Sequence, residues 1–379
     1  MLFFFLAVGM PWLVIKAPYV IDAEYIDKSK AREGSAALIT GLRSALVACV
    51  AATGAGIALF YTARTYKLTR RGQVTERFTK ALERLGADDD KTYVRIGGIL
   101  AMEQIVQDAP EQATHAAQVF AQFIRMRTNA TEHDPAVKNP RPTADVQLAL
   151  TALTRPTSRT HVQPDERLDL SNLCLAGANL HGADLRDADV RGANLRDAHL
   201  GRADLQSADL TNADLTDASL SDASLRKARL LSADLRGAFL LSASLRGASL
   251  GSASLRGASL ESASLRGAHL WNADLREADF QDADLRDAGL READLREAEL
   301  VKANLYKADL RDADLREADL RAAHLYKADL RNTNLQDDPF PSGGAAVTRP
   351  SSCWARSALG CGTGPNPSMR ASSRPSTAP

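Results

Sequence analysis

The sequence predicts a β-solenoid that is preceded by membrane helices and a small all-α domain. Three observations predict this order: an uncharged run over residues 44–63, helical periodicity over 64–165, and a five-residue repeat over 168–335. The 379 residues carry 47 basic and 47 acidic side chains. The zero net charge argues against a globally basic nucleic-acid binder and against a strongly acidic tail protein.

Residues 1–63 are predicted to be a membrane anchor. The run at 44–63 has 20 uncharged residues and is bounded by Arg43 and Arg64. Twenty helical residues span about 30 Å, which is the thickness of the hydrocarbon layer. A buried helix of a soluble protein is the alternative. The apolar run at 2–15 is short for a span, and the residues leave open whether it is a full span or a truncated start.

Charge on the two sides of the span predicts its orientation. Residues 16–35 hold four basic and four acidic side chains, whereas 64–84 hold seven basic ones. Because cytoplasmic loops are enriched in Lys and Arg, we expect the chain after residue 64 to lie in the cytoplasm and the protein to reside in the cell membrane.

Residues 64–165 are predicted to be a cytoplasmic helical domain. Val74, Phe78, Leu82 and Leu85 recur at helical spacing, and Gly86 follows. Further helical segments are predicted at 94–109 before Pro110, at 111–127 and at 145–153. Asp88, Asp89 and Asp90 are the predicted N-cap residues of the second helix, and Gly97-Gly98 is read as a helix irregularity.

The repeat dominates the rest of the chain. From Leu170 to Leu335 every fifth residue is leucine except Val190 and Phe280, which makes 32 leucines at 34 positions. The residue two before each central position is alanine from Ala178 to Ala328 without exception. The residue just before the centre is most often Asp, Ser or Asn, and the two residues after the centre vary freely.

A period of five excludes an ordinary helix or strand. On a helix the leucines would form no stripe, and on a strand they would alternate between faces. A chain that turns a corner every five residues instead stacks its leucines in one buried column, with the small alanines also inside. The predicted structural core is represented by Leu185, Leu205, Leu235, Leu255, Leu275, Leu295 and Leu315. Asp, Asn or Ser before the centre is expected to bond backbone groups of the turn.

This pattern resembles the pentapeptide-repeat family. The motif A-(D/N/S)-L-x-x stands, for example, at 183–187 as ADLRD and at 313–317 as ADLRE. The resemblance implies a right-handed parallel β-helix of square, quadrilateral cross-section with four pentapeptides per coil. About 34 pentapeptides would then form about 8.5 coils and a rod about 40 Å tall at the usual strand spacing.

The amino-terminal part is similar to a bacterial subgroup of that family. There, two membrane helices precede a sequence like LTRRGQVTERFTKALERLG, which stands here at 68–86, then a helical block and the repeats. The resemblance covers roughly residues 40–335, and the short run at 2–15 departs from it.

The sequence contains no pattern that indicates catalysis. There is no HExxH, GxxxxGK[ST], GxSxG, or GxGxxG followed by a helix, and the four cysteines form no CxxC pair. We therefore expect no catalytic, cofactor-binding or metal site, no cofactor and no enzyme. His199, His269 and His324 occupy the position before a central leucine, where a structural role in the turn is expected.

Arginine follows the central leucine at 16 of the 34 repeats and marks a candidate interaction surface. With 20 residues per coil these arginines stack in two columns on opposite faces. The candidate residues are Arg226, Arg246, Arg266 and Arg286 in one column and Arg236, Arg256, Arg276, Arg296 and Arg316 in the other. Net charge along 168–224, 225–270 and 271–335 is −6, +5 and −5. The alternative is a solvated surface whose arginines relax against neighbouring carboxylates.

Both ends of the rod are expected to be covered. The apolar segment Val146–Leu153 is predicted to lie over the first coil, and Phe340 is the candidate cap of the last. Residues 336–379 are rich in Pro, Ser and Gly and are predicted to be a disordered tail. No end-to-end rod dimer is expected.

These observations leave three functions open. The leading hypothesis is a membrane-tethered cytoplasmic scaffold that binds an unknown protein partner, with no direct nucleic-acid contact. The second is a DNA-mimic regulator of an enzyme such as gyrase, which the resemblance implies for acidic rods of the family. The third is an activity housed in the helical domain.

Overall fold

The computed structural model describes residues 34–88, 90–131, 141–160, 162 and 167–335. The apolar run 2–15, the Phe340 cap and the tail 336–379 lie outside this part of the chain. The chain divides into two compact units, Met1–Arg77 and Phe78–Pro379, and each is described by itself.

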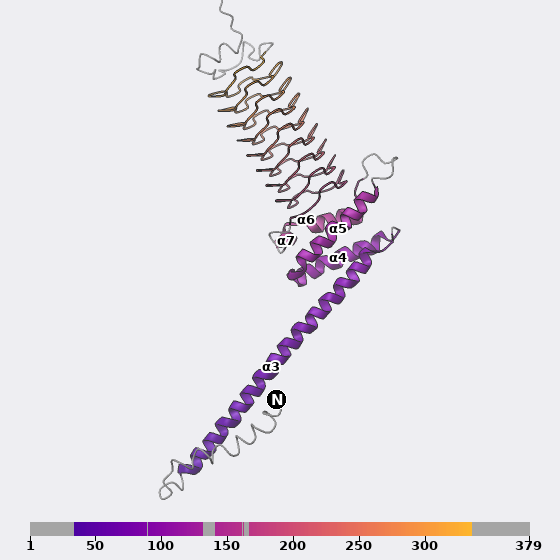
Figure 1. Ribbon diagram of the computed structural model, residues 1–379, viewed down its shortest axis with the longest axis vertical. Helices are drawn as coiled ribbons and strands as arrows, with labels where there is room; N and C mark the ends of the chain where they lie inside the picture. The colour runs from indigo at the N-terminus through magenta and orange to yellow at the C-terminus, as the bar shows by residue number, and fades with distance from the viewer. Residues whose placement is uncertain (1–33, 89, 132–140, 161, 163–166, 336–379) are drawn as a thin grey trace, which may run out of the picture. The chain divides into compact units, whose positions relative to one another are not determined.

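The described part of the first unit belongs to one continuous helix, α3, which runs over Gly34–Leu85 (Figure 1). Its 52 residues extend about 78 Å at 1.5 Å per residue, well beyond a hydrocarbon layer. Within the described residues it is the one helix long and apolar enough to cross a membrane, and none of its apolar stretch is buried. The helix predicted from Val74 onwards is therefore a continuation of the candidate span, and it ends just before Gly86.

The second unit begins with the end of α3 and a group of short helices. They are α4 (Thr92–Asp108), the 3₁₀ turn η2 (Pro110–Gln112), α5 (Ala113–Thr131), α6 (Ala144–Thr154) and α7 (Pro156–Arg159). Ile99, Met102, Phe120, Ile124 and Leu150 form the core between them.

Two contacts of α4 were not predicted from the sequence. A Cβ at Gly98 would stand 2.9 Å from the Ala81 carbonyl oxygen, so this glycine allows the end of α3 to pack closely and is more than an irregularity. Arg95 Nε donates a 2.6 Å hydrogen bond to Asp145 on α6, and both side chains are buried. Burial alone would raise the pKa of Asp145, but hydrogen bonds from Thr143 and Arg95 lower it.

The predicted N-cap of α4 is wrong. The N-cap residue is Lys91, and no side chain caps the helix there. The backbone carbonyl of Asp88 instead accepts a hydrogen bond from the Arg95 guanidinium. The segment before α4 is thus held by a buried arginine inside the helix, which is a tertiary contact that local capping rules do not include.

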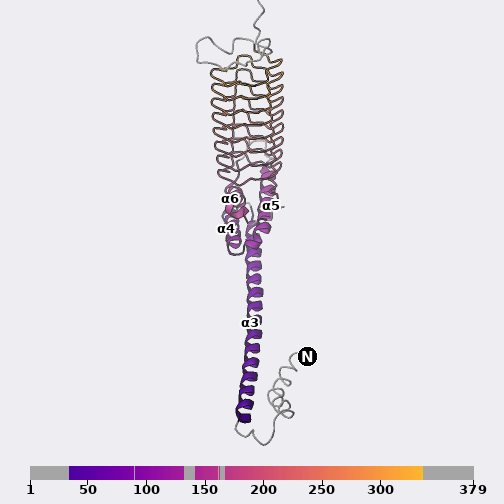
Figure 2. The ribbon, with the colours of Figure 1, turned by 90° about the vertical axis from the view of Figure 1, so that its left-hand side faces the viewer.

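Residues 167–335 form a stack of coils in which each residue lies above the one 20 positions earlier (Figure 2). Parallel β-bridges join Asp169 to Asp189 and continue in steps of five up to Asp314 and Asn334. Each coil therefore contains four pentapeptides, as the resemblance implied. For example, Leu255 N–H donates to the Asp274 carbonyl of the next coil at 2.7 Å, and Ala258 N–H donates to the Leu255 carbonyl across the turn at 2.9 Å.

Leucine and alanine fill the inside of the rod. The seven predicted core leucines, Leu185, Leu205, Leu235, Leu255, Leu275, Leu295 and Leu315, are each at most 1% exposed. Phe280, which replaces one leucine, is fully buried in the same column. The alanine two positions earlier is buried in every repeat from Ala178 to Ala328, because the corner leaves room only for a small side chain.

The turn occupies the two residues after each central leucine, and the residue before the leucine forms the β-bridge. His199, His269 and His324 are therefore bridge residues, not turn residues as predicted. The second turn residue has a φ near +60°, which glycine adopts without strain at Gly247 and Gly257, while Asp, Glu, Lys, Ser or Asn stands there in most other repeats.

Helix α6 lies against the first coil, as predicted for Val146–Leu153. Gln147 Nε2 donates to the Asn179 carbonyl at 2.8 Å, and Asn179 N–H donates back to Gln147 Oε1 at 2.9 Å. Asp184 N–H donates to the Thr154 carbonyl at 2.7 Å. These bonds satisfy backbone groups at the edge of the rod that would otherwise have no neighbouring coil.

Candidate interaction surface

The nine candidate arginines lie on the outside of the rod. The register of 20 places Arg226, Arg246, Arg266 and Arg286 in one column and Arg236, Arg256, Arg276, Arg296 and Arg316 in another. They do not share one environment. The bridge residue two positions earlier in the chain decides what each guanidinium contacts.

Where that residue is aspartate, the arginine folds back onto it. Arg276 Nε and Nη2 donate to the two carboxylate oxygens of Asp274, each at 2.8 Å, which is the bidentate geometry that favours arginine. The same pairing occurs at the arginines of 186, 191, 236, 286, 296, 311, 316, 321 and 331. We name these the Asp–Arg turns.

The Asp–Arg turns also hold the local backbone. Asp274 Oδ1 accepts a 3.3 Å hydrogen bond from the Arg276 backbone N–H, so the aspartate bonds the turn as predicted. The hydrogen bond from the Arg276 side chain lowers the pKa of Asp274, and the pairing raises the pKa of Arg276. The two opposite charges of each pair largely cancel, so the pair produces only a small electrostatic field outside the turn.

In the middle coils, residues 225–270, serine takes the place of that aspartate before most of the arginines. Ser224, Ser244, Ser254 and Ser264 precede Arg226, Arg246, Arg256 and Arg266 on their turns. All four arginines are exposed, whereas Arg276, Arg286, Arg296 and Arg316 in the following coils are half-buried.

Two of the four arginines find a carboxylate one coil further on. Arg256 contacts Glu277 at 2.6 Å and Arg266 contacts Asp287 at 3.4 Å. Among the described residues, Arg226 and Arg246 have no carboxylate oxygen within 4.0 Å. The charge profile of the sequence indicates this basic zone. It does not by itself indicate that serine replaces the aspartate that would pair with each arginine. The motif S-L-R is the sequence signal for that exchange.

Exposed apolar side chains accompany the middle coils. Phe239 is 54% exposed and Trp271 is 51% exposed. The Trp271 ring lies over Gly251, where a Cβ would stand 2.3 Å from a ring atom, so only glycine leaves room for it. The repeat pattern by itself singles out neither residue.

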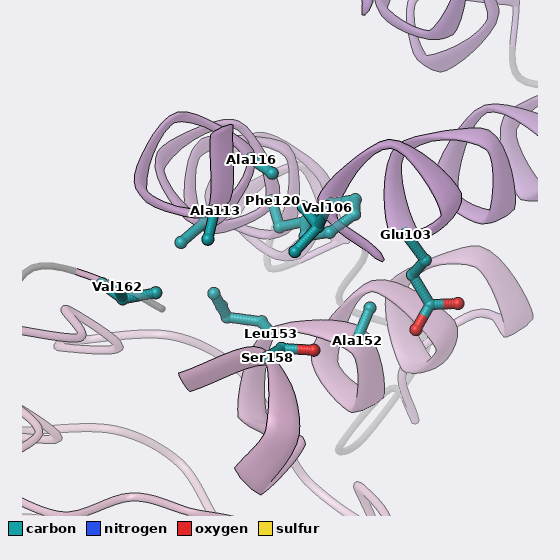
Figure 3. A pocket seen from close by; sticks show the side chains of 10 residues that line it. Glu103, Val106, Ala113, Ala116, Phe120, Ala152, Leu153, Ser158 and Val162 are labelled. Carbon is teal, nitrogen blue, oxygen red and sulfur yellow. The ribbon is translucent and has the colours of Figure 1, made fainter. Parts of the chain in front are cut away.

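The helices of the second unit form an open groove of about 700 Å³ between the end of α3 and α5, lined by Leu82, Leu85 and Met126 among others, and a much smaller cavity. A cavity of about 20 Å³, room for about one water molecule, lies between α4, α5 and α6 (Figure 3). Its lining is mostly apolar, with Phe120 and Leu153 among the residues that face it and Glu103 at its edge. No group of three or more His, Cys, Asp or Glu in the described part of the chain could hold a metal ion.

Comparisons with known proteins agree on the repeats. The model of the family "Pentapeptide repeats" matches in eight copies between residues 167 and 337. Among solved structures, HetL, a pentapeptide repeat protein involved in heterocyst differentiation regulation from the cyanobacterium Nostoc, is 31% identical over 45% of this chain and 90% of its own, with a TM-score of 0.20.

Two further solved structures are similar over the rod. A trypsin-treated form of QnrB1, a plasmid-mediated fluoroquinolone resistance protein, is 22% identical over 42% of this chain and 90% of its own, with a TM-score of 0.30. A pentapeptide repeat protein from the Arabidopsis thaliana thylakoid lumen is 28% identical over 31% and 83%, with a TM-score of 0.26. No curated protein matches the chain.

Proposed function

We propose that this chain, which belongs to the pentapeptide-repeat family and carries its right-handed β-helix, is a membrane-tethered cytoplasmic scaffold. Helix α3 would anchor it through the apolar stretch at 44–63, and the rod would present a rigid surface to a partner protein. Proteins of this family are in general structural or interaction proteins.

One observation carries the proposal: the outside of the rod is free to vary while the inside is uniform. Leucine and alanine fill every inward position, so each outward side chain changes without cost to the core. The exposed arginines of the middle coils use that freedom. The apolar window of α3, none of which is buried, supports the tether.

The basic middle of the rod weakens the alternative of a DNA mimic. Mimicry requires a broad negative field, and the middle coils carry a net charge of +5 between two acidic stretches. A gyrase supercoiling assay with the soluble rod is expected to show no change. An activity in the helical domain has no catalytic motif to support it, and the cavity between α4, α5 and α6 offers no titratable cluster.

Site-specific crosslinking in cells tests the scaffold. A photoreactive residue placed at Arg246, on the rod, is expected to yield a discrete protein adduct, whereas one at the buried Leu245 should yield none. If photoreactive residues on all four faces of the rod yield no discrete adduct, the scaffold proposal is wrong.

Reporter fusions test the tether and its orientation. A reporter after Ala63 is expected to be cytoplasmic, and one within 17–34 is expected to lie outside the cell. If both reporters are cytoplasmic, the two ends of 44–63 lie on the same side of the membrane, which would contradict α3 as a span. Recovery of the full chain in the soluble fraction would contradict the tether altogether.

A further inference from the structure

We infer that one face of the middle coils is a docking site for a short acidic peptide segment of the partner, an inference that rests on the proposed scaffold function. The site is the column Arg226, Arg246 and Arg266, which we name the basic strip. Its three arginines lie above one another on successive coils, about 4.8 Å apart.

The surroundings of the basic strip are small and uncharged. Ser244 and Ser264 stand before two of its arginines, and Gly247 and Gly267 follow them. The outward neighbours of two of the arginines in sequence are therefore small, and none of the three arginines has a carboxylate at the position before its central leucine. Lys227 adds a further exposed positive charge beside Arg226.

The lack of a carboxylate partner distinguishes Arg226 and Arg246 of the basic strip from the arginines of the Asp–Arg turns. The guanidinium of an Asp–Arg turn already donates two hydrogen bonds to the aspartate of its own repeat. Arg226 and Arg246 keep theirs available, since no carboxylate among the described residues lies within 4.0 Å of either. Arginine forks match carboxylates in shape and charge, so the group they fit best is an Asp or Glu side chain of another chain.

The length of the basic strip selects the kind of anion. On the same face, Asp184 and Asp204 precede the strip, and Asp284 and Asp287 follow it. Three coils span only about 10 Å between the first and last arginine. A nucleic-acid duplex or an anionic bilayer would extend beyond the strip, over turns whose arginines are already paired with aspartates, whereas a peptide with two or three carboxylates matches the strip in length.

Peptide binding to the detergent-solubilised full chain tests the inference. A fluorescein-labelled peptide that contains three consecutive glutamates flanked by glycine and serine is titrated at low salt, and its anisotropy is measured. Arg226→Gln with Arg246→Gln is expected to weaken binding at least about tenfold, the effect of one lost charge-assisted pair or more. The matched control, Arg276→Gln with Arg296→Gln, removes the same charge from Asp–Arg turns and is expected to leave the affinity within about twofold.

A second variant lowers the net charge by the same amount but removes no arginine. Ser224→Asp with Ser244→Asp keeps every arginine but supplies each with the partner seen at Asp274, and it is expected to weaken peptide binding about as much as the double arginine exchange. Equal affinity of this variant and the unaltered chain would overturn the inference, as would equal losses in the control. Tighter binding of duplex DNA or anionic vesicles than of the peptide, dependent on the same arginines, would overturn it too. Loss of peptide binding alone leaves crosslinking from the other three faces of the rod as a separate test of the scaffold.

Discussion

The middle coils and the coils that follow them share one core and differ at one outward position. Leu255 and Leu275 are both fully buried, one coil apart, and the alanines beside them are equally hidden. Before the next arginine, however, Ser254 stands in one coil and Asp274 in the other. That exchange leaves Arg256 to reach Glu277 in the next coil, while Arg276 folds onto its own turn.

The comparison separates what stabilises the rod from what it presents. Stability comes from apolar burial and from backbone bonds between coils, which are the same in both regions. The outward residue before the leucine determines whether the arginine after it pairs within its own repeat or remains available to a partner. A repeat protein can therefore change its surface one coil at a time without altering its fold.

The largest effect is expected from breaking the shared core. Leu255→Asp places a charge without a partner inside the leucine column and is expected to destabilise the protein by several kcal/mol. Arg256→Asp, one residue on, faces outward and loses only an exposed ion pair, a cost below about 1 kcal/mol. Thermal unfolding measures both. Equal melting temperatures would contradict the inward placement of Leu255.

A smaller effect is expected from exchanging the two kinds of turn. Asp274→Ser removes the bidentate pair and the bond to the Arg276 backbone, and it is expected to cost about 0.5–1 kcal/mol. The reverse exchange, Ser254→Asp, is expected to be neutral or slightly stabilising. Denaturant unfolding with hydrogen exchange of the affected coil checks both. A loss of stability from Ser254→Asp would show that the two turns are not equivalent scaffolds.

Acid is expected to distinguish the two regions without any substitution. The paired arginines lower the pKa of Asp274, Asp284 and Asp309 in the folded state. Because their folded pKa lies below the unfolded value of about 3.9, their contribution is complete above that pH and is lost as pH falls through the folded pKa. Amide exchange below about pH 4 should therefore accelerate more in residues 271–335 than in 240–265, where Glu261 is the only carboxylate. Uniform acceleration would contradict this.

The smallest effect on stability is expected at the basic strip itself. Arg246 has no carboxylate within 4.0 Å among the described residues, so Arg246→Gln should change the free energy of unfolding by less than about 0.5 kcal/mol. Arg276→Gln, the same exchange at an Asp–Arg turn, should cost more because it leaves Asp274 without its fork. If Arg246→Gln is the more destabilising of the two, Arg246 stabilises the rod and is not available for a partner.

The sequence by itself determined the rod. A strict period of five leaves few ways to bury so many leucines, and each coil repeats the contacts of the one before, so local pattern and tertiary contact coincide. The candidate span at 44–63 could be predicted for a similar reason, since length and lack of charge are properties of one segment. The end of α3 before Gly86 and the placement of α6 on the first coil also followed from apolar spacing.

Only the tertiary structure decided the contacts between segments that no period relates. Arg95 and Asp145 are 50 positions apart, and nothing in their local sequence indicates that they form a buried pair. Gly98 acquires its role because the Ala81 backbone packs against it. On the rod, the sequence identifies the arginines, but the geometry of the turn decides which of them pair with an aspartate. Side-chain direction at a corner follows from backbone shape, and that shape exists only once the coils are stacked.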